Sequence, residues 1–410
     1  MKKINESTIV EIFIIWFLFQ TVITSSLLIY SDYKNIVSVI LKINITARIL
    51  MILFGICVLL YNKVKKNFII PLFIYALIVI ITKLYNDSYE FLDALFIAFV
   101  FRDKLKQENI INIFLGTILI SLSIVIVLYF AGVFPSYDLI RSDGKVRISL
   151  GFAHPNTLGY YIMILCFLGV LRIKGKVKCY HILLLAAASY FVYVYPNSKT
   201  SAFSILLFAF YLVINKIYSF IHNKNITKNR IFRIGSIILI PILIIAVYRV
   251  VYIALDYTMS NEAFRAFFNR FRLGNSAFQQ YGIHLFGSKE IEFAGTAARY
   301  FGITTAKYFT VDSFYIYILV KFGIIPSLFF FIYYISCIKA CINAGDSYIL
   351  VMLLIIAVYS ISESMILAIP SSFLFIISSK YLWNRENNLA SKLNRTANLI
   401  IFTKLENKDI

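Results

Sequence analysis

The segment 147–159 has the residue types and the spacing of an anion-binding helix start. It reads RISLGFAHPNTLG and joins a polar segment to a wholly apolar one. Proline is favoured at the first position of a helix, so a helix is predicted to begin at Pro155, with His154 in extended backbone before it. Asn156 and Gly159 follow in the first turn, where free N–H groups and the helix dipole attract anions and glycine permits close approach. The flanking cations are Arg141, Lys145, Arg147 and His154. The alternative is an ordinary helix start after a solvated basic loop.

Two polar loops each carry arginines. The first, 133–155, supplies Arg141 and Arg147, and the second, 254–311, supplies Arg265, Arg270 and Arg272. An arginine fork binds phosphate oxygens in a bidentate way and stays charged at physiological pH. Arginines that arrive from two different loops are therefore suited to clamp a diphosphate between them.

Other polar side chains near these loops are candidates for proton transfer or charge stabilisation. A histidine at the mouth of a span can act as a general base because its pKa lies near neutrality, so His154 and His284 are candidates. Each is alternatively a hydrogen-bonding side chain. Asp312 opens an apolar run, where it either caps a helix or orients an acceptor hydroxyl or a histidine. Lys199, in the turn PNSKT, adds a further cation.

Charged residues also occur in or near the apolar runs. They are Arg48, Lys321 and Glu363. Such residues are usually paired or line a pathway through the membrane. The sequence does not identify the partners of these three residues.

The polar loops lack the pattern of a metal site. Hard cations need several oxygen ligands, and the acids of the loops include no D-x-D pair. Those acids are Asp138, Asp143, Asp256, Glu262, Glu290, Glu292 and Asp312. The 5 cysteines show no metal-ligand spacing. We therefore expect neither a metal ion nor a cofactor, with arginines neutralising the anion.

The elements that must position these residues are membrane spans. The chain is 60% hydrophobic and 15% charged, its mean hydropathy is +0.81, and apolar runs of membrane-spanning length recur throughout. We predict about twelve spans in one integral membrane domain, 1–410, which makes the chain an all-α polytopic membrane protein with a large extracytoplasmic loop. The predicted spans are 9–30, 43–61, 68–84, 88–101, 110–132, 156–173, 179–195, 200–218, 232–253, 312–338, 348–363 and 370–383.

The basic residues indicate how the chain is oriented. The net charge is +20, but the lysines and arginines lie mostly in short connections between apolar runs, a pattern that serves topology and anionic lipid and does not indicate nucleic-acid binding. This distribution predicts cytoplasmic termini and places loops 133–155 and 254–311 outside.

The long loop contains a predicted amphipathic helix. In the segment 261–287, phenylalanines at 264, 267, 268 and 271 recur at steps of three and four residues, with Arg265, Arg270 and Arg272 on or beside the polar side. Anchoring among lipid headgroups is the alternative to a functional role.

Four motifs of the chain together resemble those of one known family. The motifs are R-x-S-L-G-F-x-H-P-N-x-L-G before a span, N-S-K-T opening a later span, N-R before the L-F-G of the long loop, and V-D-S-x-Y leading into K-F-G-I-I. Over residues 130 to 365 they resemble the bacterial polysaccharide repeat-unit polymerases of the Wzy type, found in capsule and O-antigen clusters, and more distantly the O-antigen ligases. The resemblance implies a GT-C-like glycosyltransferase of the bacterial cytoplasmic membrane that uses undecaprenyl-diphosphate-linked oligosaccharide. It also implies a flippase and chain-length regulator proteins as partners.

The resemblance assigns roles to particular residues. Arg147 and Asn156 match the first-loop residues of the family, and His154 matches its histidine. Arg270 matches the arginine of the long loop, and Asp312 the aspartate that opens the next span. The chain departs from the pattern at Lys199, where arginine is expected, and at His284, where proline often precedes L-F-G.

Two other functions compete with polymerisation. An O-antigen-type ligase would use the same donor with a different acceptor. A flippase or secondary transporter commonly shows internal repeats and short, even loops, and this sequence shows neither. A structural membrane component without catalysis is a third alternative, and the paired arginine loops argue against it.

Overall fold

The computed structural model describes residues 5–61, 66–135, 137, 139–140, 144, 146–253, 262–288, 291, 295–302 and 309–383. Within this part of the chain, 8 helices are long and apolar enough to cross a membrane. They are α1 (Glu6–Thr24), α2 (Lys34–Tyr61), α3 (Lys66–Asn86), α5 (Gln107–Phe130), α6 (Pro155–Arg172), α8 (Lys199–His222), α9 (Arg230–Ile253) and α13 (Ile324–Ala344). Shorter apolar helices are α7 (Cys179–Val194) and α14 (Ser347–Tyr359), and α4 (Glu90–Phe96) continues as a π-helical turn, η2 (Ile97–Phe101). The chain is an all-α polytopic membrane protein, but helix length alone does not confirm about twelve spans.

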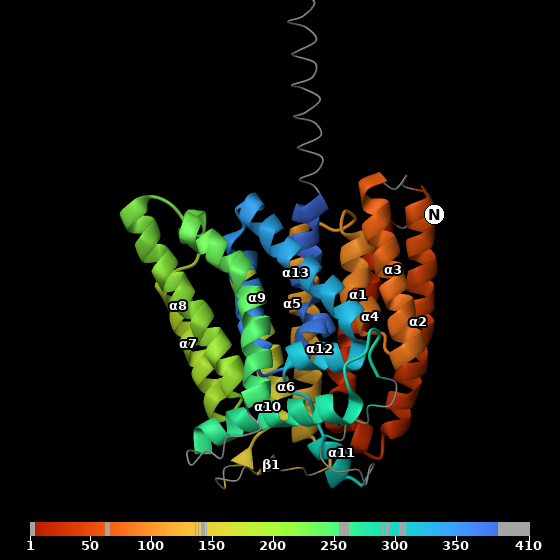
Figure 1. The fold of residues 1–410 in the computed structure, drawn as a ribbon. Coiled ribbons are helices and arrows are strands. Elements are labelled where there is room, and N and C mark those ends of the chain that lie inside the picture. Colours follow the sequence, from red (N-terminus) through yellow and green to blue (C-terminus); the bar gives the residue numbers. More distant parts are fainter. Residues whose placement is uncertain are drawn as a thin grey trace, which may run out of the picture.

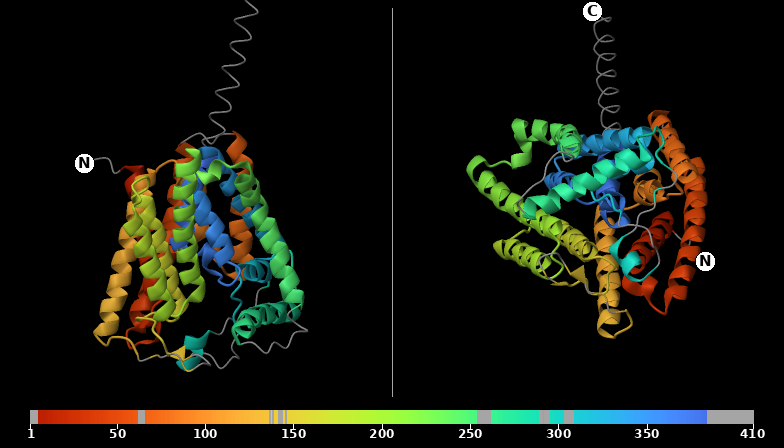
Figure 2. Two further views of the ribbon diagram at one scale, coloured as in Figure 1. Left: turned by 90° about the vertical axis from the view of Figure 1, so that its left-hand side faces the viewer. Right: turned by 60° about the horizontal axis from the view of Figure 1, so that its bottom comes forward.

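The long helices form a bundle with two distinct ends (Figures 1 and 2). At one end lie β1 (Leu139–Ile140), α10 (Glu262–Tyr281) and α11 (Thr296–Tyr300), and we call it the loop end. At the other end α1 begins and the helix 372–383 finishes, and we call it the basic end. Both polar loops singled out in the sequence therefore share one end, opposite the start of α1.

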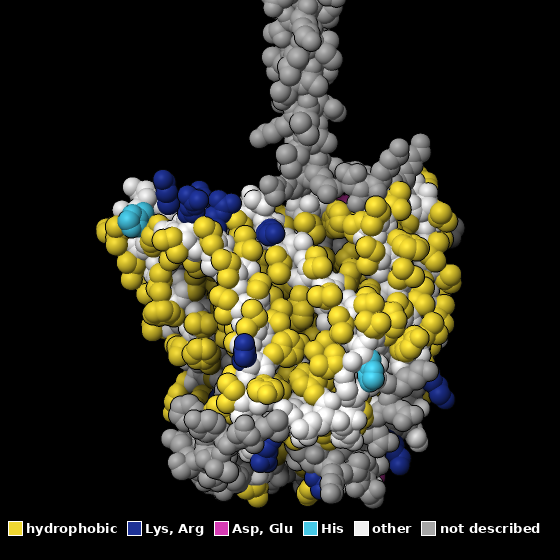
Figure 3. Space-filling model, in the orientation of Figure 1, with side chains coloured by type: hydrophobic (Ala, Val, Ile, Leu, Met, Phe, Trp, Pro, Cys, Tyr) yellow, Lys and Arg dark blue, Asp and Glu magenta, His cyan; other side chains and the backbone are white. Residues whose placement is uncertain are grey.

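Hydrophobic side chains cover the face of the bundle seen in Figure 3 between its two ends. Ile70, Phe73 and Phe210 are 68%, 63% and 60% exposed. Large exposed apolar surfaces are unfavourable in water, and a bilayer is the solvent that would cover them.

The polar segment before α6 is anchored to the end of α1. The Leu27 N–H donates to the Gly151 carbonyl at 2.7 Å, and the Ala153 N–H donates to the Ser25 carbonyl at 3.1 Å. Farther back, β1 pairs with β2 (Val146–Arg147) in antiparallel register. These bonds fix the backbone that carries Arg147 and leads into α6.

The predicted amphipathic segment forms α10, which lies across the loop end (Figures 1 and 2). Phe271 is 1% exposed, and α10 packs against α9 and α12 (Phe314–Phe322), so its apolar face is directed to the protein. Arg270 is half-buried beside Phe271, whereas Arg272 is exposed. The structure describes the backbone of residues 262–267 but not their side chains, and Arg265 is one of these residues.

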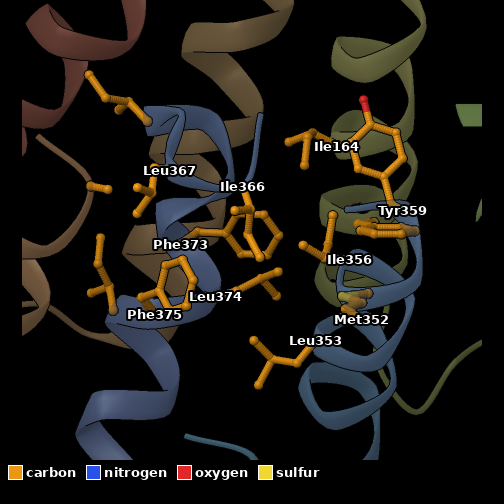
Figure 4. Close-up of a cluster of buried hydrophobic side chains, with 14 of the residues drawn as sticks. Ile164, Met352, Leu353, Ile356, Tyr359, Ile366, Leu367, Phe373, Leu374 and Phe375 are labelled. Atoms are coloured by element: carbon orange, nitrogen blue, oxygen red, sulfur yellow. The ribbon is translucent and has the colours of Figure 1, made fainter. Parts of the chain in front are cut away.

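Two predicted spans, 348–363 and 370–383, are instead the limbs of a hairpin. The 13 residues of α14 rise about 20 Å, and the 372–383 helix is of similar length, whereas a bilayer core is about 30 Å thick. The limbs pack through buried side chains such as Ile356 and Leu374 (Figure 4). The turn between them contains the 3-10 segments η4 (Met365–Leu367) and η5 (Ile369–Ser371) and carries Glu363 into the protein.

The predicted span 312–338 is also not one helix. Gly323 has φ 88° and separates α12 from α13. The Ile324 and Ile325 N–H groups, which lack partners inside α13, donate to the carbonyls of His284 and Leu285 at 3.0 and 3.1 Å. A Cβ at position 323 would lie 2.3 Å from the Gly287 nitrogen, so glycine is required where the long loop enters the helix break.

Candidate functional site

Arg147 is almost completely buried at the loop end. It is 6% exposed, and its Nε donates to the carbonyl of Pro196, in the turn between α7 and α8, at 3.0 Å. Its Nη2 donates to Oδ1 of Asn156, the second residue of α6. Arg147 therefore joins the first polar loop to the starts of two membrane helices.

Asn156 connects Arg147 to a buried carboxylate. Its Nδ2 donates to Oε1 of Glu363, in the tip of the hairpin, at 2.8 Å. The amide oxygen faces a cation and the amide nitrogen faces a carboxylate, which fixes the orientation of the side chain. Asn156 thus links Arg147 in the first polar loop to Glu363 in the hairpin through two side-chain hydrogen bonds.

Arg270 reaches the same carboxylate from α10. Its guanidinium lies 3.6 Å from Oε1 of Glu363 and 3.4 Å from Oδ2 of Asp312, and Nη1 donates to the Ser362 carbonyl at 2.9 Å. The side chains of Arg270 and Asp312 keep 24% and 30% exposure. We call the linked residues Arg147, Asn156, Glu363, Arg270 and Asp312 the polar network. It has a buried end at Arg147 and an accessible end at Asp312.

The protonation of Glu363 is set by burial. Its side chain is 10% exposed, and desolvation raises its pKa to about 7, assisted by the negative charge of Asp312. Arg270, the hydrogen bond from Asn156 and the charge of Arg147 act in the opposite direction. A carboxyl group with this pKa exchanges protons near neutral pH, as a general acid or base requires.

His154 caps α6. Its backbone is extended, at φ −143° and ψ 136°, and Pro155 begins the helix, as predicted. The Asn156 N–H donates to His154 Nδ1 at 3.1 Å, and the Thr157 N–H donates to the His154 carbonyl at 3.0 Å. The N–H groups that were expected to bind an anion are therefore satisfied by His154 itself. Because Nδ1 accepts this hydrogen bond, the neutral imidazole carries its proton on Nε2, which can donate a proton but cannot accept one.

Gly159 has a packing role in the structure. A Cβ built there would lie 2.6 Å from the Cβ of Ser198, which precedes α8. The group that approaches the backbone of α6 is thus a neighbouring helix start, and the close approach helps to place the Pro196 carbonyl beside Arg147.

The remaining predicted site residues do not join the polar network. Lys199, Arg272 and His284 are exposed, and His284 Nε2 lies 2.8 Å from the Tyr281 carbonyl. Arg272 is two residues from Arg270, which places the two side chains about 200° apart around α10. Arg141 lies outside the described residues.

Glu363 is the residue whose role the sequence did not reveal. In the sequence Glu363 is only one of three charged residues in or near apolar runs, the others being Arg48 and Lys321. The structure pairs Arg48 with Asp93 on α4, and Lys321 with Glu90 at 2.6 Å. An ionisable residue next to an apolar run is a candidate for function, but the residues that Glu363 contacts, Arg270 and Asn156, lie far away in the sequence.

Within the described residues, no group of three or more His, Cys, Asp or Glu side chains is arranged to hold a metal ion. Asp312 and Glu363 both contact Arg270, which offsets their charge. The polar network is chemically suited to bind an anion by exchange of arginine partners and to transfer a proton. Comparison with protein-family models, curated proteins and solved structures finds no match to this chain.

Proposed function

We propose that this protein polymerises undecaprenyl-diphosphate-linked oligosaccharide repeat units into a surface polysaccharide, such as capsule or O-antigen, at the outer face of a bacterial cytoplasmic membrane. The observation that carries the proposal is that Arg147 and Arg270, from two separate polar segments, are linked through one buried carboxylate. Arg270 contacts Glu363 directly, and Arg147 is connected to it through Asn156. The motif resemblance described above supports the same activity.

The arginines would stabilise the leaving group. In the reaction an acceptor hydroxyl oxygen bonds to C1 of the donor sugar, and the bond from C1 to the diphosphate oxygen breaks. The diphosphate leaves with the electron pair of that bond. Preorganised guanidinium groups in a site of low dielectric stabilise such developing charge. Arg270 is the more accessible of the two, so it would contact the diphosphate first.

Glu363 would accept the proton of the acceptor hydroxyl. Protonation removes the negative charge that Arg270 contacts at 3.6 Å. The guanidinium then interacts more strongly with the departing diphosphate, so proton transfer and leaving-group stabilisation are coupled through one arginine. Asp312 would hold Arg270 in place.

The test is reconstitution with lipid-linked repeat units and electrophoresis of the products. The wild-type protein should give a ladder, and Arg270→Ala and Glu363→Gln should each remove most of it while remaining folded. Arg249→Ala is the matched control, because Arg249 is an exposed arginine near the end of α9 at the loop end. Absence of a ladder from active donor and wild-type protein, in the presence of acceptor, would reject the proposal.

A transporter is the second candidate, because broken helices and buried charges are also typical of secondary transporters. The helix break at Gly323 and the hairpin that carries Glu363 are the specific observations in its favour. Proteoliposomes distinguish the two functions. Movement of lipid-linked oligosaccharide across the bilayer without bond formation would support transport, whereas transfer of a single glycan to a different lipid would support a ligase.

The proposal also requires the loop end to face the outside. A reporter fused after residue 288 should report an extracytoplasmic position, and one fused at residue 224 should report the cytoplasm. A cytoplasmic signal at 288 would separate the polar network from flipped donor lipid and overturn the site assignment.

A further inference from the structure

A second charged feature lies at the basic end, remote from the polar network. It is a groove of about 460 Å³ between α9 and α13. Its lining consists of Arg230, Arg233, Ile234, Ile237, Lys339, Ile342 and Asn343. The groove therefore combines three cations with aliphatic side chains and contains no acidic residue.

The order of these residues along α9 matches a boundary between water and lipid. On α9, Arg230, Arg233, Ile234 and Ile237 share one face, because they are spaced by three, four and seven residues from the first. The arginines lie nearest the basic end, and Ile237 lies about 10 Å farther into the bundle. Charge is thus placed at the mouth of the groove and aliphatic surface below it.

The facing helix contributes its residues in a different order. On α13, Asn343 lies nearest the helix end at the mouth of the groove, and Ile342 lies next to it. Lys339 lies about one turn farther into the bundle. Lysine can run its alkyl chain along apolar surface while its ammonium reaches the interface. Lys339 can therefore meet the same ligand as the two arginines.

Within the part of the chain that the structure describes, the three cations have no acidic partner. Among the described residues, Arg230, Arg233 and Lys339 take part in no ion pair, whereas Lys174 at the same end binds Asp346 at 2.6 Å. Lysine and arginine side chains gather over α8 and α9 at this end, above the hydrophobic belt (Figure 3). The groove is accordingly a cationic pocket with an apolar floor.

We propose that this groove is a specific binding site for an anionic phospholipid. The phosphate would be held by Arg230, Arg233 and Lys339, and Asn343 would donate to headgroup oxygens. The acyl chains would lie against Ile234, Ile237 and Ile342. Arginine forks bind phosphate oxygens in a bidentate way, and the apolar floor selects a phosphate that carries hydrocarbon.

The test uses native mass spectrometry of the purified full chain after exchange into nanodiscs of phosphatidylcholine with one quarter phosphatidylglycerol. We expect wild-type protein to retain phosphatidylglycerol in preference to phosphatidylcholine. The triple variant Arg230→Gln, Arg233→Gln, Lys339→Gln should bind phosphatidylglycerol at least tenfold less. Arg172→Gln, Lys176→Gln, Lys178→Gln, at the same end but outside the groove, removes equal charge and should retain it.

A second variant identifies the source of the phosphate. Ile234→Ser, Ile237→Ser keeps the cations and removes part of the apolar floor, so it should lose phosphatidylglycerol without losing thermal stability. Equal losses in the two charge variants would show non-specific attraction and overturn the proposal. Equal retention of both lipids by the wild type would also overturn it, as would competition by inorganic phosphate that is as effective as by phosphatidylglycerol.

Discussion

Replacement of Glu363 by glutamine is expected to make the protein more stable than the wild type at neutral and alkaline pH. Burial raises the pKa of Glu363 from 4.5 to about 7. In the unfolded chain this carboxyl loses its proton near its ordinary pKa, whereas in the folded protein it holds the proton to a higher pH. Its contribution to stability is therefore fully present below about pH 4.5, falls as pH rises to about 7, and is constant above that.

The size of the effect follows from the shift. One unit of pKa corresponds to about 1.4 kcal/mol, so ionisation of Glu363 costs the folded state ~3 kcal/mol in all. The side chain is only 10% exposed, so solvent screening reduces this figure little. Glutamine cannot ionise, yet it keeps an oxygen that can accept the hydrogen bond from Asn156 Nδ2.

The assay is thermal unfolding of purified protein in detergent between pH 5 and 8.5. The melting temperature of Glu363→Gln minus that of the wild type should rise by several degrees up to about pH 7 and then level off. Glu108→Gln, which removes an exposed glutamate in the first turn of α5 at the basic end, controls for the lost charge. If the melting temperatures of the two proteins change in parallel with pH, burial is not the dominant influence on the pKa of Glu363. The same conclusion holds if the melting temperature of the wild type rises relative to that of the variant as pH increases.

The other expected outcomes concern the arginines, the helix cap, the helix contact and metal dependence. Arg147→Ala and Arg270→Ala should each lower the polymerisation rate by about 10²–10³-fold, and lysine at either position should rescue poorly because it lacks the fork; normal polymer from both alanine variants would exclude the clamp. His154→Asn should keep most of the activity because asparagine caps well, and an inactive but folded variant would show that the imidazole takes a direct part in the reaction. Gly159→Ala should destabilise the protein by about 1–3 kcal/mol through overpacking against Ser198. Gly169→Ala on the same helix is the control and should not, because an added Cβ there would have no neighbour within 4 Å. Excess chelator should leave product yield unchanged, whereas loss restored by magnesium would contradict an arginine-only mechanism.

The membrane character of the protein and most of its helices could be predicted from the sequence, since hydropathy and charge are local properties. Long apolar runs must satisfy their backbone hydrogen bonds internally, which makes them helices. The start of α6 at Pro155 and the amphipathic α10 were predicted for equally local reasons, namely proline geometry and the spacing of phenylalanines.

The breaks in the helices could not be predicted in the same way. The segments 312–338 and 348–363 are apolar enough to read as spans, yet one is interrupted at Gly323 and the other turns back after Tyr359. The break at Gly323 is stabilised by carbonyls of His284 and Leu285. Because these two residues lie far from Gly323 in the sequence, the mean hydropathy of a short sequence window does not detect their contact with the helix break.

The candidate site shows the same division. The residue types at Arg147, Asn156, Arg270 and Asp312 already indicated anion chemistry, because arginine charge and geometry do not depend on the fold. Only the tertiary structure decided that these four are linked, that His154 is used as a cap, and that Glu363 contacts both Asn156 and Arg270. The physical reason is that a carboxyl group acquires its pKa and its contacts from burial and from neighbouring charges, which packing brings together from five separate segments of the chain.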